Sequence, residues 1–214
     1  YPFRKDNRYL SHKCYIQPVF MEMPAVCLPL NLVGFMLLKD CSQIYTLGPQ
    51  GTFSDEATQK VRYSGTSVSY INTFVEALFK VTEDPDSVAI VPIENSVAGT
   101  VAQVQDSLVR NDLVILGEIN LLIEYALLAN AELQQVEHYF SHPQALEQSS
   151  HFISKNMARA QSKLTRSNVD SGIQFLETVE SGNDPVAAIV PLSFAEDKPH
   201  WKKASRIQDY LNNT

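Results

Sequence analysis

Residues 88–99 read Val-Ala-Ile-Val-Pro-Ile-Glu-Asn-Ser-Val-Ala-Gly, and this stretch decides the fold. The apolar run Val88–Val91 predicts a buried strand. It stops abruptly at an acid, an amide and a hydroxyl side chain. In open α/β sheets, ligands bind beyond the carboxyl ends of the strands. The spacing therefore predicts a ligand site at Asn95, Ser96 and Gly99.

Strand and helix patterns alternate along the rest of the chain. Strands are predicted at Ile44–Leu47, Leu113–Leu116 and Ile119–Leu128, and helices by Phe74, Leu78 and Val81 and by Ile173, Leu176 and Val179. Ala187–Leu192 echoes Val88–Ile93, which suggests two related strand-loop units. Such alternation is typical of mostly parallel sheets. We predict an α/β protein with two lobes, lobe 1 about 44–117 plus 196–214 and lobe 2 about 118–195.

The composition limits the partners of the chain. With 214 residues and 44% hydrophobic content, it is long enough for one large domain or two small lobes. A formal net charge of −7 and scattered basic residues argue against nucleic acid or a membrane as a partner. Cys14, Cys27 and Cys41 show no metal-ligand spacing, and they favour reduced thiols in a cytoplasmic protein over a disulfide framework.

Residues 1–43 form an atypical N-terminal segment, in which basic residues precede the apolar stretch Ala25–Leu38. This order is typical of a signal peptide, but a proline and an asparagine interrupt the stretch, and no cleavage pattern follows it. The stretch is also too short to span a membrane. We favour a third interpretation, in which natural translation starts at Met36 or Met23 and the upstream residues are not native.

A second candidate site follows the strand predicted at Ile44–Leu47. The glycine-rich residues 48–51 predict a turn, and Thr52 opens a helix whose free N–H groups and dipole favour an anion. Helix capping alone also explains Thr52. The loop matches neither a P-loop nor a dinucleotide fingerprint.

Two further titratable side chains, His142 and Glu94, are candidates for proton transfer. His142 could act as a general acid or base, but the order Ser-His-Pro at residues 141–143 is more typical of a helix cap with proline in the first turn. Glu94 could transfer protons, yet no partner carboxylate lies near it in the sequence. We therefore favour structural roles for both.

Taken together, these segments resemble the catalytic domain of prephenate dehydratase. The matching stretches are Leu47–Ser54, Val91–Gly99, Gly117–Glu118, Ser141–Leu146, Ala187–Ile189 and Ile207 with Asp209. They follow the family order from about Ile44 to the C-terminus. The resemblance implies a two-lobe fold like that of a periplasmic ligand-binding protein, with a substrate cleft between the lobes.

The resemblance also implies the chemistry. The family converts prephenate to phenylpyruvate, with loss of water and carbon dioxide, on the route to L-phenylalanine and without a metal or organic cofactor. Such a hydro-lyase must hold two carboxylates and protonate a leaving hydroxyl, which positioned hydroxyl and amide groups can do. By resemblance, Thr52, Asn95, Ser96 and Gly99 line the substrate pocket. The family associates through its catalytic domains, which implies a homodimer.

The chain departs from the family before the Ala187 strand. The family has a Ser-Thr pair ahead of the preceding helix, and counting back from Ala187 places Asp170 and Ser171 there. Ser171 is then expected to keep the hydroxyl in the substrate pocket. Asp170 adds a negative charge near a dianionic substrate, which is unfavourable unless it points away or pairs.

A larger departure lies at the end of the chain. The family continues with Asn-x-Thr-Arg-Phe, whereas this chain stops at Asn212-Asn213-Thr214. In one register Thr214 is the catalytic threonine; in the other, which the spacing from Asp209 favours weakly, the motif begins at Asn213. Either register predicts an impaired catalyst, without the regulatory ACT domain that usually follows.

Three functions stay open at this level. The chain is a dehydratase, a non-catalytic binding module for a small aromatic acid, or a relative that decarboxylates prephenate without losing water. The Glu-Asn-Ser cluster at residues 94–96 favours dehydratase ancestry. It does not separate an active enzyme from a binding protein.

Overall fold

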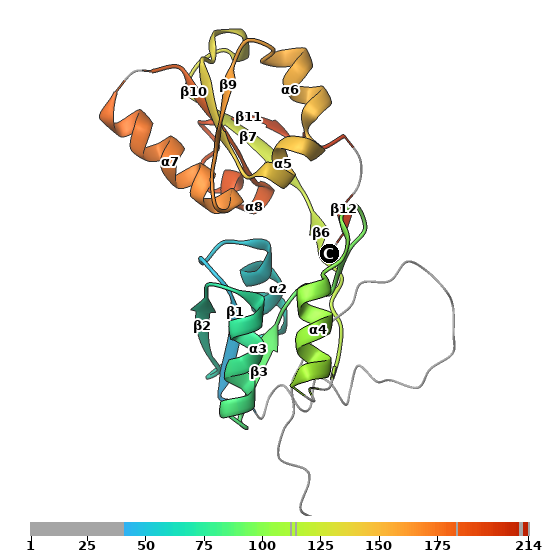
Figure 1. The fold of residues 1–214 in the computed structure, drawn as a ribbon. Helices are drawn as coiled ribbons and strands as arrows, with labels where there is room; N and C mark the ends of the chain where they lie inside the picture. The colour runs from blue at the N-terminus through green and yellow to red at the C-terminus, as the bar shows by residue number, and fades with distance from the viewer. Residues whose placement is uncertain (1–40, 112, 114, 183, 210–211, 214) are drawn as a thin grey trace, which may run out of the picture. The chain divides into compact units, whose positions relative to one another are not determined.

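The computed structural model describes residues 41–214 except 112, 114, 183, 210, 211 and 214, and these residues form two compact α/β units (Figure 1). The first unit contains the described residues up to Gln50, residues Ser54–Leu121 and Asn213. The second contains Gly51–Phe53 and Leu122–Asn212. The short segment Gly51–Phe53 therefore belongs to the second unit although both of its neighbours in sequence belong to the first.

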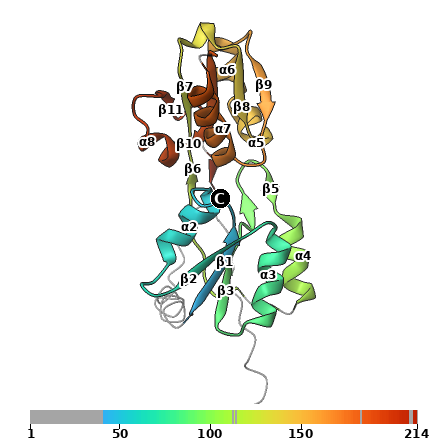
Figure 2. The same cartoon turned by 90° about the vertical axis from the view of Figure 1, so that its left-hand side faces the viewer.

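The first unit is built on a parallel sheet. Among the described residues this sheet has three strands in the order β2-β1-β3. The elements of the unit are β1 (Gln43–Leu47), α2 (Phe53–Val61), β2 (Ser67–Ile71), α3 (Phe74–Glu83), β3 (Ser87–Ile90), β4 (Glu94–Asn95), β5 (Gly99–Thr100) and α4 (Ala102–Arg110). Helix α3 packs on β1 and β3 with α4 beside it (Figure 2). Leu78, Val81, Ala89 and Val104 are buried together between these elements.

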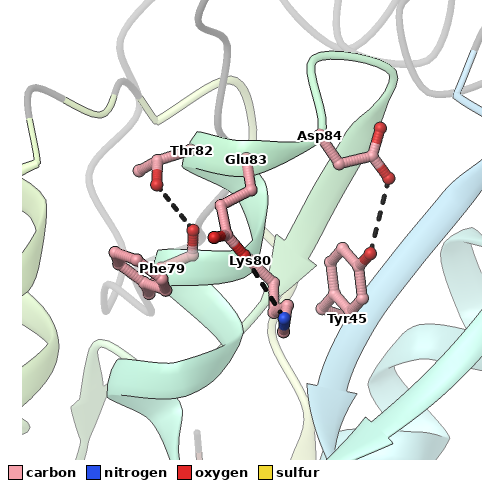
Figure 3. Close-up of polar contacts among 6 residues, drawn as sticks. All are labelled: Tyr45, Phe79, Lys80, Thr82, Glu83 and Asp84. Atoms are coloured by element: carbon pink, nitrogen blue, oxygen red, sulfur yellow. Dashed lines mark hydrogen bonds and ion pairs between the residues drawn. The ribbon is translucent and has the colours of Figure 1, made fainter.

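Asp84 ties the end of α3 to β1 and to the start of β3. The Tyr45 hydroxyl donates to its carboxylate at 3.4 Å (Figure 3). Burial, and then the charge of Asp84, raises the pKa of Tyr45. The Asp84 carbonyl accepts from the Ser87 hydroxyl at 2.6 Å. The exposed ion pair of Lys80 and Glu83 in the same turn contributes little to stability, because water screens it. Asp84 thereby stabilises the turn between α3 and β3.

The second unit is built on a mixed sheet. Among the described residues it has five strands in the order β11-β7-β10-β8-β9. The elements are β6 (Leu122–Ile123), β7 (Tyr125–Ala129), η1 (Leu133–Gln135), β8 (His138–Ser141), α5 (Pro143–Gln148), α6 (Ser150–Asn156), β9 (Gln161–Leu164), α7 (Asn168–Ser181), β10 (Val186–Pro191), α8 (Leu192–Glu196), β11 (Lys202–Ser205) and β12 (Asn212–Asn213). Because β7 runs antiparallel to β10 and β11, the prediction of mostly parallel sheets is confirmed for the first unit and is wrong at this edge of the second. Helix α7 packs along β10 and β8 (Figure 1).

Several local predictions can be compared with the structure. The strands predicted at Ile44–Leu47 and Val88–Val91 are confirmed as β1 and β3. The helix predicted from Phe74, Leu78 and Val81 is confirmed as α3, and the Thr73 side chain caps it by accepting from the Glu76 N–H at 3.1 Å. The strand predicted at Leu113–Leu116 is wrong for its described residues. The Leu113 N–H instead donates to the carbonyl of Leu108 at the end of α4, and its side chain packs against the core of the first unit.

The predicted boundaries also need correction. Residues 196–212 belong to the second unit rather than the first, because β11 pairs with β7 and Arg206 forms an ion pair with Glu124. Of the atypical segment 1–43, only residues 41–43 are described, and Gln43 already begins β1. The other N-terminal predictions, on Cys14, Cys27, Met23 and Met36, fall outside the described residues. In the part of the chain that the structure describes, none of the helices has the length and apolar character needed to cross a membrane.

Candidate functional site

A hairpin carries the predicted residues that follow β3. Strands β4 and β5 pair antiparallel, with Asn95 opposite Gly99. The Asn95 side-chain oxygen accepts from the backbone N–H groups of Val97 at 3.1 Å and Ala98 at 2.9 Å. This is an asparagine-capped turn of the kind that short polar side chains form with their own backbone. Asn95 is 9% exposed, so its amide is part of the hairpin structure as well as a candidate ligand group.

The same hairpin is open on the side of Ser96 and Gly99. Ser96 is exposed. Gly99 has φ +77, a conformation that side chains rarely adopt, and a Cβ added there would meet no atom within 4 Å. The structure therefore brings Asn95, Ser96 and Gly99 together, with space next to the Gly99 backbone.

Thr52 lies in the Gly51–Phe53 segment of the second unit. Within this unit the Phe53 ring stands edge-on to the ring of Tyr125, with centroids 5.7 Å apart. Gly51, at φ +86, lies close to Val169 in the first turn of α7. Apolar contacts of the residues on both sides of Thr52 thus hold the segment. Helix α2 begins at the residue after Thr52, as predicted.

Ser171 lies inside α7, which corrects its predicted position. The helix begins at Asn168, and the side chain of Ser167 caps it by accepting from the Asp170 N–H at 3.0 Å. The position ahead of the helix therefore belongs to Ser167, and counting back from Ala187 missed it. Ser171 is 0% exposed, and its hydroxyl lies 2.7 Å from that of Thr165.

Asp170 does not stand as an isolated charge near this helix start. Its carboxylate accepts from the Arg166 N–H and from the Gln174 side chain, each at 3.2 Å. A carboxylate in the first turn of a helix also interacts favourably with the helix dipole. These contacts account for an acid at a position where the family resemblance made it look unfavourable.

His142 is the N-cap of α5, as the sequence suggested. Its Nδ1 accepts from the Gln144 N–H at 3.4 Å, and Pro143 occupies the first helical position. Burial lowers the pKa of His142, which favours the neutral ring that can accept this hydrogen bond. Ser149 separates the end of α5 from the start of α6.

The segment that leads to the C-terminus is anchored by side chains that the sequence did not single out for this role. Gln208 accepts from the Tyr125 N–H at 3.1 Å and donates to the Ile123 carbonyl at 3.0 Å. The Asp209 carboxylate accepts from the His151 N–H at 3.2 Å. Asp209 belongs to a stretch that resembles the family, but its contact partners are distant in sequence. Thr214 itself lies outside the described residues.

The described residues offer hydrogen-bonding groups rather than a metal-binding cluster. Nowhere in the described part of the chain do three His, Cys, Asp or Glu side chains gather so that they could hold a metal ion. Burial raises the pKa of the Tyr125 phenol, which is therefore neutral at physiological pH. Neutral hydrogen-bonding groups dominate the candidate residues.

Comparison with known proteins matches residues 44–214 to the prephenate dehydratase family. The prephenate dehydratase of Lactococcus lactis subsp. cremoris is 33% identical over 174 residues, which cover 80% of this chain and 61% of that protein. The bifunctional chorismate mutase/prephenate dehydratase of Buchnera aphidicola subsp. Acyrthosiphon pisum is 34% identical over 130 residues, 58% of this chain and 34% of that protein. The solved structure of prephenate dehydratase from Staphylococcus aureus has a TM-score of 0.63 at 27% identity and covers 80% of this chain and 64% of that one.

These matches confirm the predicted α/β fold of the two-lobe, periplasmic-binding-protein type. The chain spans less than two thirds of the length of each of these relatives. The match includes every predicted site residue from Thr52 to Thr214.

Proposed function

Since the chain belongs to the prephenate dehydratase family, we propose that it is a cytoplasmic hydro-lyase that converts prephenate to phenylpyruvate in L-phenylalanine biosynthesis. The observation that carries the proposal is the Asn95 hairpin. It lies beyond the carboxyl end of the buried strand β3, the usual place for a ligand in such sheets. Its backbone is fixed by the Asn95 side chain.

The proposed chemistry uses this chain's own hydrogen-bonding groups. Prephenate carries two carboxylates and a ring hydroxyl, and formation of the aromatic ring drives the loss of water and carbon dioxide. Asn95, Ser96 and the Gly99 backbone bind the anionic substrate, and Thr52 is a further candidate hydroxyl for it. In the register that makes Thr214 the family threonine, Thr214 donates the proton to the leaving hydroxyl. Holding these groups in fixed positions lowers the barrier, because little reorganisation is needed during the reaction.

Product formation tests the proposal directly. Purified protein incubated with prephenate is expected to release phenylpyruvate, followed by its ultraviolet absorption in alkali, together with one equivalent of carbon dioxide. Binding of phenylpyruvate without turnover would favour a non-catalytic binding protein. Carbon dioxide without phenylpyruvate would instead identify a decarboxylase. If the protein neither converts prephenate nor binds phenylpyruvate, the proposal is refuted.

Substitutions of Asn95 separate its contribution to the stability of the turn from its contribution to ligand binding. We expect Asn95→Ala to weaken phenylpyruvate binding about tenfold and to destabilise the protein by about 1–2 kcal/mol, because two backbone N–H groups lose their acceptor. Asn95→Asp keeps an acceptor oxygen but adds a negative charge, so it is expected to weaken binding with a smaller loss of stability. Calorimetry and urea unfolding measure the two effects.

Asn111→Ala is the matched control for Asn95. The Asn111 amide donates to the Ser107 carbonyl at the end of α4, in the same unit and away from the hairpin. Its loss is expected to lower stability without changing phenylpyruvate affinity. Equal affinities for wild type and Asn95→Ala would remove Asn95 from the pocket.

A further inference from the structure

Asp55 is a buried carboxylate that the proposed chemistry does not use. It lies near the start of α2 and is 5% exposed. Its Oδ1 accepts from the Tyr70 hydroxyl at 2.7 Å and from the Gln59 side chain at 2.8 Å. A carboxylate accepts stronger hydrogen bonds than a neutral oxygen does, so Asp55 is a strong anchor for both partners.

Tyr70 connects the two ends of the loop that carries Thr52. At the start of the loop, the Gly48 N–H donates to the Ile71 carbonyl at 3.0 Å, and Gly48 lies so close to Tyr70 that an added Cβ would stand 2.9 Å from the Tyr70 Cβ. At the end of the loop, the phenol of the same Tyr70 reaches Asp55. One side chain thus spans the points where the loop leaves and re-enters the first unit.

The end of the loop has a second, buried anchor. The Ser54 carbonyl accepts from the Thr58 hydroxyl at 2.8 Å, and the Thr46 hydroxyl on β1 lies 3.3 Å from the same oxygen. Thr46 and Thr58 are both fully buried. These bonds fix Ser54 to the sheet, and the Tyr70 to Asp55 bond then sets its position relative to Gly48.

Burial and the hydrogen bond to Asp55 keep the Tyr70 phenol in its donor form. Burial, and then the hydrogen bond to Asp55, raises the pKa of Tyr70 to about 12, against a smaller opposing effect of Arg62. The hydroxyl is therefore protonated throughout the physiological range. Tyr70 is also 38% exposed, so its bond to Asp55 is made at the rim of the unit rather than in its core.

We infer that Asp55 and Tyr70 are positioning residues, which hold the two first-unit ends of the Gly48–Ser54 loop that carries the candidate ligand residue Thr52. The inference rests on the proposed function for its ligand. Neither residue is proposed to contact the substrate. They act by fixing both ends of the loop, so their loss should loosen the loop while the cores of both units stay folded.

Three variants and one control test the inference. Tyr70→Phe removes only the hydroxyl, Asp55→Ala removes the acceptor, and Asp55→Asn keeps an acceptor oxygen. Tyr45→Phe is the control, because it removes a tyrosine to aspartate hydrogen bond elsewhere in the same unit. Amide hydrogen exchange of Gly48, compared with the β3 amides, reports on the loop, and calorimetry with phenylpyruvate reports on the ligand.

We expect Tyr70→Phe and Asp55→Ala to speed exchange at Gly48 roughly tenfold or more relative to β3 and to weaken phenylpyruvate binding by a similar factor. Asp55→Asn should give intermediate values, because it keeps an acceptor oxygen but loses the charge, and Tyr45→Phe should change neither. Unchanged Gly48 exchange in Tyr70→Phe, or a looser loop with unchanged affinity, overturns the inference. If the wild type binds no phenylpyruvate, the proposed function fails, and the exchange data alone decide whether the pair holds the loop.

Discussion

Phe175→Ala is expected to destabilise the second unit by about 3–5 kcal/mol, as is typical when a buried aromatic ring is truncated. Phe175 is 0% exposed on the face of α7 that packs against β10 and β8. Its neighbours in the core include Phe140, Ala188 and Val190. Removing the ring leaves a cavity that strands on one side and a helix on the other cannot close, so both transfer energy and packing contacts are lost.

Trp201 provides the measurement. It is the single tryptophan of the chain, and its ring stands edge-on to Phe175 at a centroid distance of 6.0 Å. Urea unfolding followed by its fluorescence therefore reports on this unit. Ile173→Ala on the same helix is the control, because Ile173 is 40% exposed, and it should shift stability by no more than about 0.5 kcal/mol. A Phe175→Ala midpoint as close to wild type as that of the control would contradict the packing described above.

This pair of residues also shows where sequence reasoning fails. The spacing of Ile173, Leu176 and Val179 predicted a helix, and the helix exists. Leu176 and Val179 pack against the core, whereas Ile173 is exposed and the buried positions include Val169, Gly172 and Phe175. The periodicity of the apolar residues predicts that a helix forms. Which of its faces is buried depends on how the helix packs against the sheet. Gly172 lies where the ring of Phe194 approaches α7, a contact that no local pattern reveals.

Strands held mainly by their neighbours were missed for a related reason. All residues of β9 (Gln161–Leu164) are exposed, and their polar sequence carries no strand signal. The strand forms because it pairs in parallel with β8, Tyr139 opposite Ser162. Likewise, the His151 N–H at the start of α6 donates to the carboxylate of Asp209, which lies far along the chain. Such contacts depend on the assembled fold, whereas the buried strand β3 is predictable from its local run of apolar residues.

The place of the candidate residues in the fold was predictable, because Asn95 comes soon after the apolar run that forms the buried strand β3. The hairpin that pairs Asn95 with Gly99 was not predicted. The supporting residues around Thr52 were not predictable, because Asp55, Tyr70 and Gly48 meet only when β2 lies beside β1. A ligand group can be read from a motif, but the residues that hold it come from other elements.

Gly48→Ala should therefore disturb both the fold and the ligand site. An added Cβ would stand 2.9 Å from the Cβ of Tyr70 and 3.8 Å from its carbonyl carbon, atoms that cannot swing away as the end of a long side chain can. Either β2 shifts from β1 or the loop moves, and we expect about 1–3 kcal/mol of destabilisation, as for overpacked sites. The same shift should weaken phenylpyruvate binding by about tenfold, because the start of the loop moves. Urea unfolding and calorimetry measure the two effects.

Gly182→Ala is the matched control for this substitution. Gly182 follows α7, its backbone is extended at φ −168, and an added Cβ would meet no atom within 4 Å. That change should be neutral or slightly stabilising, because alanine restricts the unfolded chain without straining the folded one. If Gly48→Ala behaves in the same way, the close approach of Gly48 to Tyr70 does not constrain the loop. A loss of stability with unchanged affinity would instead mean that the loop moves independently of Thr52, and only the fold would then depend on this glycine.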